Sequence, residues 1–373
     1  MRCIHISDLH LGKQFKEHSL CEDQEFVLDK ICGICEDEKI DALLIAGDIY
    51  QTSTPSAEAM KLFDTFLDRI CGLGIKVFMI SGNHDSDIRI SYFSSLIEKA
   101  GIFTSRAFDG KLQSIVYPGQ ENVVIHLIPY LKPIHVRKFY PDEKIDTYQD
   151  AMEVVLKNSP LDKSKTNILL CHQFITGALT SDSEELVIGG LDNIDYTVFS
   201  EFDYVALGHI HRPQHIGRKE VRYSGSILKY SFSEAHFEKS CTLLDISEDG
   251  KIEISTIPLP NLHEVREVSG MYDELINLPI SYDYVSVTIH DENATPDAVY
   301  NLRSVFPNML SFRIENAKTA VDVDIEKLDE IDKKTPVELF SDFYRSQNGN
   351  VEMTKEQMNI ITTIAEGLEG TDL

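Results

Sequence analysis

The sequence lacks tryptophan and has no apolar run that could cross a bilayer. Nowhere do about 18 consecutive apolar residues occur, the length that a transmembrane helix needs. The first residues, MRCIHISDLHLG, contain no apolar core of a signal peptide. We therefore expect a cytoplasmic protein that makes no membrane contact.

Cysteine is scarce and odd in number. The 373 residues include seven cysteines spread along the chain, which favours reduced thiols over a disulfide framework. Cys32 and Cys35 have the C-x-x-C spacing of some redox and zinc sites. They stand inside an amphipathic helical pattern, and no second pair of Cys or His follows at zinc-finger spacing. We interpret them as small apolar side chains on a buried face.

Basic residues are few relative to acidic ones. Lys and Arg number 35 against 61 Asp and Glu, which gives a formal net charge of -26. Such a chain repels polyphosphate at long range, so nucleic-acid binding requires a local basic surface, bound cations or a partner. Two segments are locally basic: residues 205–230, with Arg212, Arg218, Lys219, Arg222 and Lys229, and residues 130–139, with Lys132, Arg137 and Lys138. Either segment could equally be an ordinary solvated face.

The first two thirds of the chain alternate apolar runs with amphipathic helical patterns, which predicts an α/β fold. Helices are predicted over residues 21–38 and from 55 to 71. Strands are predicted within residues 2–8, 41–48, 75–85, 122–130, 166–174, 204–214, 222–232 and 240–259, the last range being a hairpin that turns at 248–250.

The pattern changes near Met271. Residues 283–291, 295–306 and 309–316 read as strand, helix and strand, the pattern of a βαβ unit. Two further helical patterns close the chain. We therefore predict three parts: a large domain at 1–268, a small α/β capping domain at 269–333 and C-terminal helices at 334–373.

Polar side chains follow the predicted strands at the point where each strand ends. They are Asp8, His10, Asp48, Asn83, His84, His172, His209 and His211. Taken alone, each has an ordinary explanation as a turn former or a hydrogen-bonded core residue. Together they would meet at the carboxyl edge of an α/β sheet, where functional sites assemble.

This mixture of ligands suits a pair of metal ions. Two hydrolytic metals about 4 Å apart need a bridging carboxylate, together with neutral ligands that leave the site positive toward a phosphate. Asp48 is the natural bridge. His209 and His211 are separated by one residue, so in an extended segment they share a face. Glycines precede three of these positions, at Gly47, Gly82 and Gly208, where crowding around a cation would penalise a Cβ.

The motifs D-x-H (Asp8, His10), GD (Asp48), GNHD (residues 82–85), a later His172 and GHIH (residues 208–211) resemble the calcineurin-like metallophosphoesterase superfamily. The resemblance implies a layered β-sandwich flanked by helices. The stretches MRCIHISDLHLGK, ALGHIHRPQ and YSGSILKYSFSE, with the small domain and terminal helices, make the whole chain similar to the bacterial nuclease subunits related to the break-repair nucleases of archaea and eukaryotes.

The resemblance implies a role for each of these residues. One metal would be held by Asp8, His10, Asp48 and His211, and a second by Asp48, Asn83, His172 and His209. Manganese is the expected ion, although nitrogen and oxygen ligands also suit iron, zinc or cobalt. His84 would be the catalytic acid, which is not a ligand and either protonates the leaving 3′ oxygen or stabilises the phosphorane, and Asp85 would orient it. Archaeal relatives carry a second histidine where this chain has Gln51, so the DNA-positioning role of that histidine is not carried over.

The function that the resemblance implies is two-metal hydrolysis of DNA. It includes 3′–5′ exonuclease activity on duplex ends and endonuclease activity on hairpins, under the control of an ATPase partner with a coiled coil. It also implies a homodimer, formed through helices near residues 57–69 and 88–100. Two alternatives remain: a small-molecule phosphodiesterase or nucleotidase with the same ligands, and a metal-free scaffold, although scaffolds of this fold lose ligands that this sequence keeps.

The two terminal helices have no catalytic explanation. Each begins with a predicted capping box, Thr335 with Glu338 and Thr354 with Gln357. Each carries one apolar stripe, made by Val337, Phe340 and Tyr344 in the first and by Met358, Ile361, Ala365 and Leu368 in the second. We expect these stripes to bind the ATPase near its coiled coil. Docking on the chain's own surface is the alternative.

Overall fold

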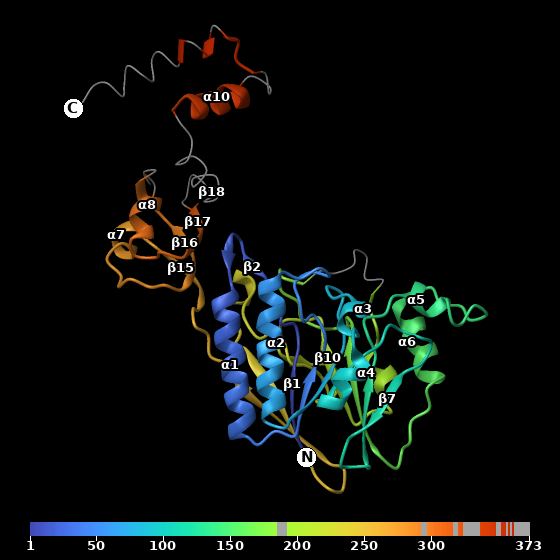
Figure 1. Ribbon diagram of the computed structural model, residues 1–373. Coiled ribbons are helices and arrows are strands. Elements are labelled where there is room, and N and C mark those ends of the chain that lie inside the picture. The colour runs from blue at the N-terminus through green and yellow to red at the C-terminus, as the bar shows by residue number, and fades with distance from the viewer. Residues whose placement is uncertain are drawn as a thin grey trace. The chain divides into compact units, whose positions relative to one another are not determined.

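The computed structural model describes residues 1–184, 192–291, 297–315, 320–323 and 336–347, with short pieces at 352–355, 357–358 and 360–361 (Figure 1). The chain divides into two compact units, Met1–Arg266 and Glu267–Leu373. A separate third part made of the terminal helices stays a prediction. No helix in the described ranges is both long and apolar enough to cross a membrane.

The first unit contains two six-stranded sheets. The first has the order β14-β13-β1-β4-β5-β6. Its strands are β1 (Arg2–Ile6), β4 (Ala42–Ile45), β5 (Lys76–Met79), β6 (Ile102–Thr104), β13 (Ser240–Ile246) and β14 (Ile252–Pro258). The strands β1, β4, β5 and β6 are parallel to one another. The strands β13 and β14 form an antiparallel hairpin, as the sequence predicted.

The second sheet has the order β11-β12-β10-β9-β8-β7. Its strands are β7 (Gln113–Val116), β8 (Val123–Leu127), β9 (Thr166–His172), β10 (Tyr204–Gly208), β11 (Gln214–His215) and β12 (Val221–Tyr223). The four strands β8, β9, β10 and β12 run parallel. A short hairpin of β2 (Gln14–Phe15) and β3 (His18–Ser19) stands apart from both sheets.

The two sheets pack face to face and form a sandwich. One buried cluster joins Leu44 and Phe78 of the first sheet to Ile168, Leu170 and Tyr204 of the second. A second cluster buries the outer face of the second sheet beneath α6 (Tyr148–Lys157). The helices α1 (Cys21–Asp37) and α2 (Ala57–Gly72) lie side by side (Figure 1), and α2 packs against β5 of the first sheet. The layered sandwich flanked by helices is therefore confirmed.

Two of the helices in the first unit, α1 and α2, begin close to their predicted positions. The helices of this unit are α1 (Cys21–Asp37), α2 (Ala57–Gly72), α3 (Asp87–Ile90), α4 (Ser94–Ile97), α5 (Pro133–Arg137) and α6 (Tyr148–Lys157), with 3-10 turns at Glu98–Ala100, Tyr196–Phe199 and Phe232–Glu234. Ser56 caps α2 by accepting a hydrogen bond from the Ala59 N–H at 3.1 Å. All seven cysteines are free, and Cys32 and Cys35 are buried in α1 as expected.

The strand predicted over residues 222–232 is wrong beyond its beginning, because β12 ends at Tyr223. Gly225 then adopts a φ of +80°, and a Cβ at this position would come within 2.7 Å of the His211 carbonyl oxygen. The chain therefore leaves the sheet and passes close behind His211. Ser224 and Ser226 are buried, so this segment packs in the interior of the protein without pairing as a strand.

The second unit contains a four-stranded sheet in the order β15-β16-β17-β18. Its elements are β15 (Val265–Gly270), α7 (Tyr272–Leu275), β16 (Tyr284–Ile289), α8 (Asp297–Arg303), β17 (Met309–Glu315) and β18 (Ala320–Val323). The strands β16 and β17 are parallel, and α8 connects them. Val287, Leu302 and Phe312 share one core, so the predicted βαβ unit is confirmed.

The first terminal helix is α10 (Pro336–Gln347), and its predicted cap at Thr335 lies outside the described residues. The second predicted capping box is present, because the Gln357 N–H donates to Thr354 Oγ1 and the Thr354 N–H donates to Gln357 Oε1. Tyr344 accepts a hydrogen bond from Gln357 at 3.2 Å. Ala365 and Leu368 of the second stripe also lie outside the described residues.

Candidate metal centre

The predicted site residues meet at the carboxyl ends of strands from both sheets of the first unit. Asp8 and Asp48 follow β1 and β4, while His172 and His209 stand at the ends of β9 and β10. Asp8, Asp48 and His209 have φ values of 52°, 49° and 103°. Such positive values are costly for residues with a Cβ and persist where the surroundings enforce them. The sandwich thus holds these three residues in a strained backbone conformation.

Asp48 lies between two groups of predicted ligands. Its Oδ2 is 3.7 Å from His10 Nε2 and 3.3 Å from His172 Nε2. Its Oδ1 accepts a hydrogen bond from the His84 backbone N–H at 2.9 Å. A Cβ at Gly82 would come within 2.1 Å of that Oδ1, so glycine is needed at this position. The geometry gives Asp48 the central location that a bridging carboxylate requires.

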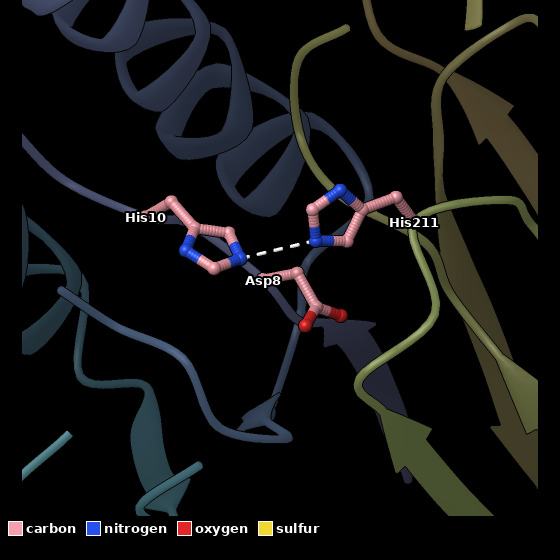
Figure 2. A group of neighbouring side chains, drawn as sticks. All are labelled: Asp8, His10 and His211. Atoms are coloured by element: carbon pink, nitrogen blue, oxygen red, sulfur yellow. Dashed lines mark hydrogen bonds between the residues drawn. The ribbon is translucent and has the colours of Figure 1, made fainter. Parts of the chain in front are cut away.

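The first group consists of Asp8, His10 and His211; the two histidine rings face each other, and Asp8 lies next to them (Figure 2). The two Nε2 atoms of His10 and His211 are 3.0 Å apart. Each residue offers a ligand atom, and these atoms all lie within 4.8 Å of one another. The Asp8 carboxylate also accepts a hydrogen bond from the His209 backbone N–H at 3.0 Å, which ties β1 of one sheet to β10 of the other.

The second group forms around Asn83. Its Oδ1 lies 3.0 Å from His172 Nε2 and 2.9 Å from His209 Nδ1. His172 Nδ1 donates to the Ala46 carbonyl oxygen at 2.8 Å, so in the neutral ring Nε2 carries a lone pair. That lone pair faces oxygen atoms of Asn83 and Asp48, which also carry lone pairs and cannot donate a hydrogen bond to it. These atoms together require a positive charge, and their nitrogen and oxygen chemistry fits a divalent transition metal.

Burial and neighbouring charges set the protonation of the site. Burial lowers the pKa of His10 well below its ordinary value, and burial with the nearby His172 lowers the pKa of His209 to about 3. Both rings are therefore neutral near pH 7, the form in which imidazole binds metals. At His172, burial is outweighed by the adjacent Asp48 carboxylate, which raises the pKa of this ring to about 9. A proton on His172 and a metal would compete for the same lone pair.

His84 and Asp85 lie beside these groups. His84 Nδ1 donates to the Gln51 carbonyl oxygen at 3.0 Å, and its ring meets the His10 ring edge to face at 4.9 Å. His84, His10 and Asp48 also offer ligand atoms within 4.8 Å of one another, so proximity alone does not distinguish an acid from a ligand. The backbone of Gln51 thus orients His84, whatever the side chain at that position.

Asp85 accepts three backbone hydrogen bonds of 3.0 Å, from Ile49, Tyr50 and Gly82. Burial raises its pKa to about 6. These bonds join the loop after β4 to the loop after β5. The predicted orientation of His84 by Asp85 therefore stays a proposal, and the contacts support an indirect form of it through the loop that carries Gln51.

The basic segment expected over residues 205–230 does not form one surface. Arg218 donates to the carbonyl oxygens of Phe199 and Phe202, Arg222 donates to Thr242, and Lys229 is buried. Arg222 thus joins β12 of the second sheet to β13 of the first, and Arg218 binds the segment that precedes β10. In contrast, Lys132, Arg137 and Lys138 are exposed around α5, which follows the carboxyl end of β8.

Sequence reasoning missed the residues behind His211. Ser183, Glu184, Glu234 and Lys239 contact its ring or its backbone. Glu234 and Lys239 are buried charges, which are rare unless paired. The available signal was YSGSILKYSFSE, a stretch in which no ligand position was identified.

Comparisons with known proteins identify the family of the chain. A model of the calcineurin-like phosphoesterases matches residues 1–213, and a model described as Type 5 capsule protein repressor C-terminal domain matches residues 261–348. The SbcD subunit of the SbcCD nuclease from Staphylococcus epidermidis is 33% identical over 341 residues, covering 88% of this chain and 90% of the relative. Its counterpart from Staphylococcus saprophyticus is 30% identical over 377 residues, covering 98% and 99%.

Among solved structures, a dimetal phosphatase from Danio rerio aligns with 70% of this chain and 99% of its own, with 11% identity and a TM-score of 0.41. Two findings show the family. The phosphoesterase model matches more than half of the chain, and the two relatives are 33% and 30% identical over most of their length. The chain belongs to the calcineurin-like phosphoesterases and, within them, to the SbcD family of metal-dependent nuclease subunits.

Proposed function

We propose that the chain hydrolyses DNA with two divalent metal ions, manganese being the most suitable, as a 3′–5′ exonuclease on duplex ends and an endonuclease on hairpins and single strands. The observation that carries this proposal is the position of Asp48 Oδ2, 3.7 Å from His10 Nε2 and 3.3 Å from His172 Nε2. A carboxylate shared by two nitrogen-bearing groups is the arrangement that a pair of ions needs.

The chemistry divides among the residues of the site. When bound, the metals would supply charge stabilisation on the phosphate oxygens and an activated water. Asp8, His10, Asp48 and His211 would hold one ion, and Asp48, Asn83, His172 and His209 the other. His84 would bring a proton to the leaving oxygen, and the Gln51 carbonyl fixes its Nδ1–H so that Nε2 is the atom that transfers the proton.

The proposal is tested with end-labelled blunt duplex and hairpin DNA in the presence of manganese, with and without an SbcC-type ATPase. We expect stepwise shortening of the duplex and cutting of the hairpin. The competing function, hydrolysis of small phosphodiesters or nucleotides by the same ligands, predicts turnover of bis(p-nitrophenyl) phosphate without loss of either DNA. A scaffold would leave all three substrates intact.

DNA would approach along the exposed cations around α5. Lys132 lies over the Tyr130 ring at 5.9 Å, and the Tyr130 ring is 6.3 Å from that of His209. This places a cation beside the second group of predicted ligands in an otherwise acidic chain. Lys132 and Arg137 are thus the best-situated residues for contacts to the backbone phosphates next to the scissile bond.

Replacing Lys132 and Arg137 with glutamate should weaken duplex binding and flatten its salt dependence. Each lost phosphate contact lowers the slope of log affinity against log salt by about 0.9. Fluorescence anisotropy with a labelled duplex at several salt concentrations measures both effects. Lys163→Glu is the control, because Lys163 is exposed and bonded to Glu201. Equal slopes for the double variant and the wild type would contradict the proposed path.

The homodimer is proposed to form through the segment from α3 to α4. Four large apolar side chains are exposed there: Ile88, Tyr92, Phe93 and Leu96, each with at least 58% of its surface accessible. An apolar patch of this kind marks an interaction site. The partner ATPase would bind elsewhere, through the terminal helices, where Phe340 of α10 is exposed.

Ile88→Asp and Leu96→Asp should separate the proposed dimer into monomers. Each buried apolar anchor contributes about 1.5–3 kcal/mol, so each change should weaken association by about 10-fold to 100-fold. Sedimentation over a range of concentrations gives the dissociation constants. Ile280→Asp, at an exposed apolar residue of the other unit, serves as the control. Dimers that persist unchanged in both variants would exclude this segment as the interface.

A further inference from the structure

A buried ion pair stands directly behind His211. Lys239 Nζ lies 2.5 Å from Glu234 Oε2, and both side chains are fully buried. Lys239 also donates to the His211 carbonyl oxygen and to Ser226 Oγ, each at 2.7 Å, so all three ammonium hydrogens have acceptors. A buried pair is costly to form, and one with every donor satisfied points to a role beyond stability.

The pair connects to the His211 ring through Ser183. Glu234 Oε1 is 2.5 Å from Ser183 Oγ, and the same Oγ is 2.6 Å from His211 Nδ1. The carboxylate, kept ionised by Lys239, can only accept, so the serine hydroxyl hydrogen goes to Glu234. The serine oxygen must then accept the Nδ1–H of His211. This order of hydrogen bonds leaves His211 Nε2 unprotonated and facing His10 and Asp8.

The same segment also holds the backbone of His211. Glu184 Oε1 accepts its N–H at 2.8 Å, while Glu184 Oε2 accepts from Ser181. Glu234 Oε1 further accepts from the Tyr230 N–H and from Ser231 Oγ. The ring and backbone of His211 are therefore held by two loops that contribute no predicted metal ligand.

We propose that Ser183, Glu234 and Lys239 are positioning residues that fix the tautomer and orientation of His211 and so set the metal affinity of the group formed by Asp8, His10 and His211. This inference rests on the proposed ligand role of His211. It deepens that role, because partners of a ligating imidazole typically change metal affinity by about 10-fold to 100-fold.

The second group provides an internal reference. His172 Nδ1 donates to the Ala46 carbonyl oxygen, a backbone group that no side-chain change removes. Its tautomer therefore does not depend on Ser183. Loss of the hydrogen bonds that link Glu234 to His211 through Ser183 should lower the metal affinity of the first group and leave that of the second unchanged. A network that only stabilises the fold would lower both affinities or neither.

Ser183→Ala is the informative variant, because Glu234 keeps Lys239, Ser231 and Tyr230 as partners and no buried charge is stranded. Calorimetric titration of the metal-free full-length chain with Mn²⁺ should show one site weakened about 10-fold to 100-fold and the other unchanged. Cobalt titration, read by absorption, should show the same single loss. Ser183→Thr keeps the hydroxyl and should restore binding to within a few-fold of the wild type.

Two further variants make the result decisive. His211→Ala identifies which calorimetric site belongs to His211, and Ser233→Ala removes a neighbouring hydroxyl that bonds Asp182 and Ser231. Wild-type affinity at both sites in Ser183→Ala, or an equal loss in Ser233→Ala, would overturn the inference while leaving the metal assignment intact. A wild type that binds fewer than two ions, or a His211→Ala variant that binds both normally, would overturn the assignment itself.

Discussion

Asp48→Ala should abolish DNA hydrolysis, with a fall of at least about 10³-fold in kcat/KM, and should lower the manganese bound per chain. The reason is that Asp48 Oδ2 lies close to His10 Nε2 and to His172 Nε2, so this one carboxylate serves both groups. Its removal leaves two cations to repel each other without screening. Metal analysis of dialysed protein, together with the exonuclease assay, measures both effects.

A second substitution at this position separates charge from shape. Asp48→Asn keeps an oxygen that can accept the His84 backbone N–H, as Asp48 Oδ1 does at 2.9 Å. It removes the negative charge, so it should lose metal and activity much as Asp48→Ala does. Retention of both ions by the folded Asn variant would mean that Asp48 does not bridge them.

His84→Gln should remove turnover and leave both metals bound. A positioned acid contributes about 10²-fold to 10⁴-fold in rate, and the loss should appear in kcat. Metal content and the Mn²⁺ titration should match the wild type, because the first and second groups of predicted ligands are unchanged. Asp87→Asn, at a half-buried neighbour in α3, is the control for local disturbance.

The outcome of this variant also decides between two roles. His84, His10 and Asp48 offer ligand atoms within 4.8 Å of one another, so a ligand role for His84 is sterically open. Loss of one ion in His84→Gln would make His84 a ligand and leave the leaving oxygen without its proposed acid. Full activity would remove His84 from the chemistry altogether.

Much of the fold was predictable because its signals are local. The buried strands read as short apolar runs ending in polar residues, and the helices α1 and α2 carry clear amphipathic patterns. The exception at residues 222–232 is instructive. The residues of this segment alternate as in a strand, but the positive φ of Gly225 takes the chain out of the sheet. Glycine is needed there because the backbone passes close to the His211 carbonyl oxygen.

The basic residues show a second limit. A run of Arg and Lys between residues 205 and 230 looks like a surface for DNA, yet Arg218 donates to the Phe202 carbonyl oxygen and Arg222 donates to Thr242 of the first sheet. A sequence shows which side chains are basic but not where each of them points in the fold. Whether a cation meets solvent or a carbonyl oxygen depends on which face of the strand the fold buries.

The order of residues along the chain was enough to establish the family and the set of candidate ligands, because each ligand stands at a strand end and parallel strands bring those ends to one edge. How the ligands are held depends instead on the three-dimensional packing. Ser183 and Glu234 are 51 residues apart in loops without periodic pattern, and they meet only behind His211. The stretch YSGSILKYSFSE contains Glu234, but only long-range packing brings this carboxylate to Ser183 and His211.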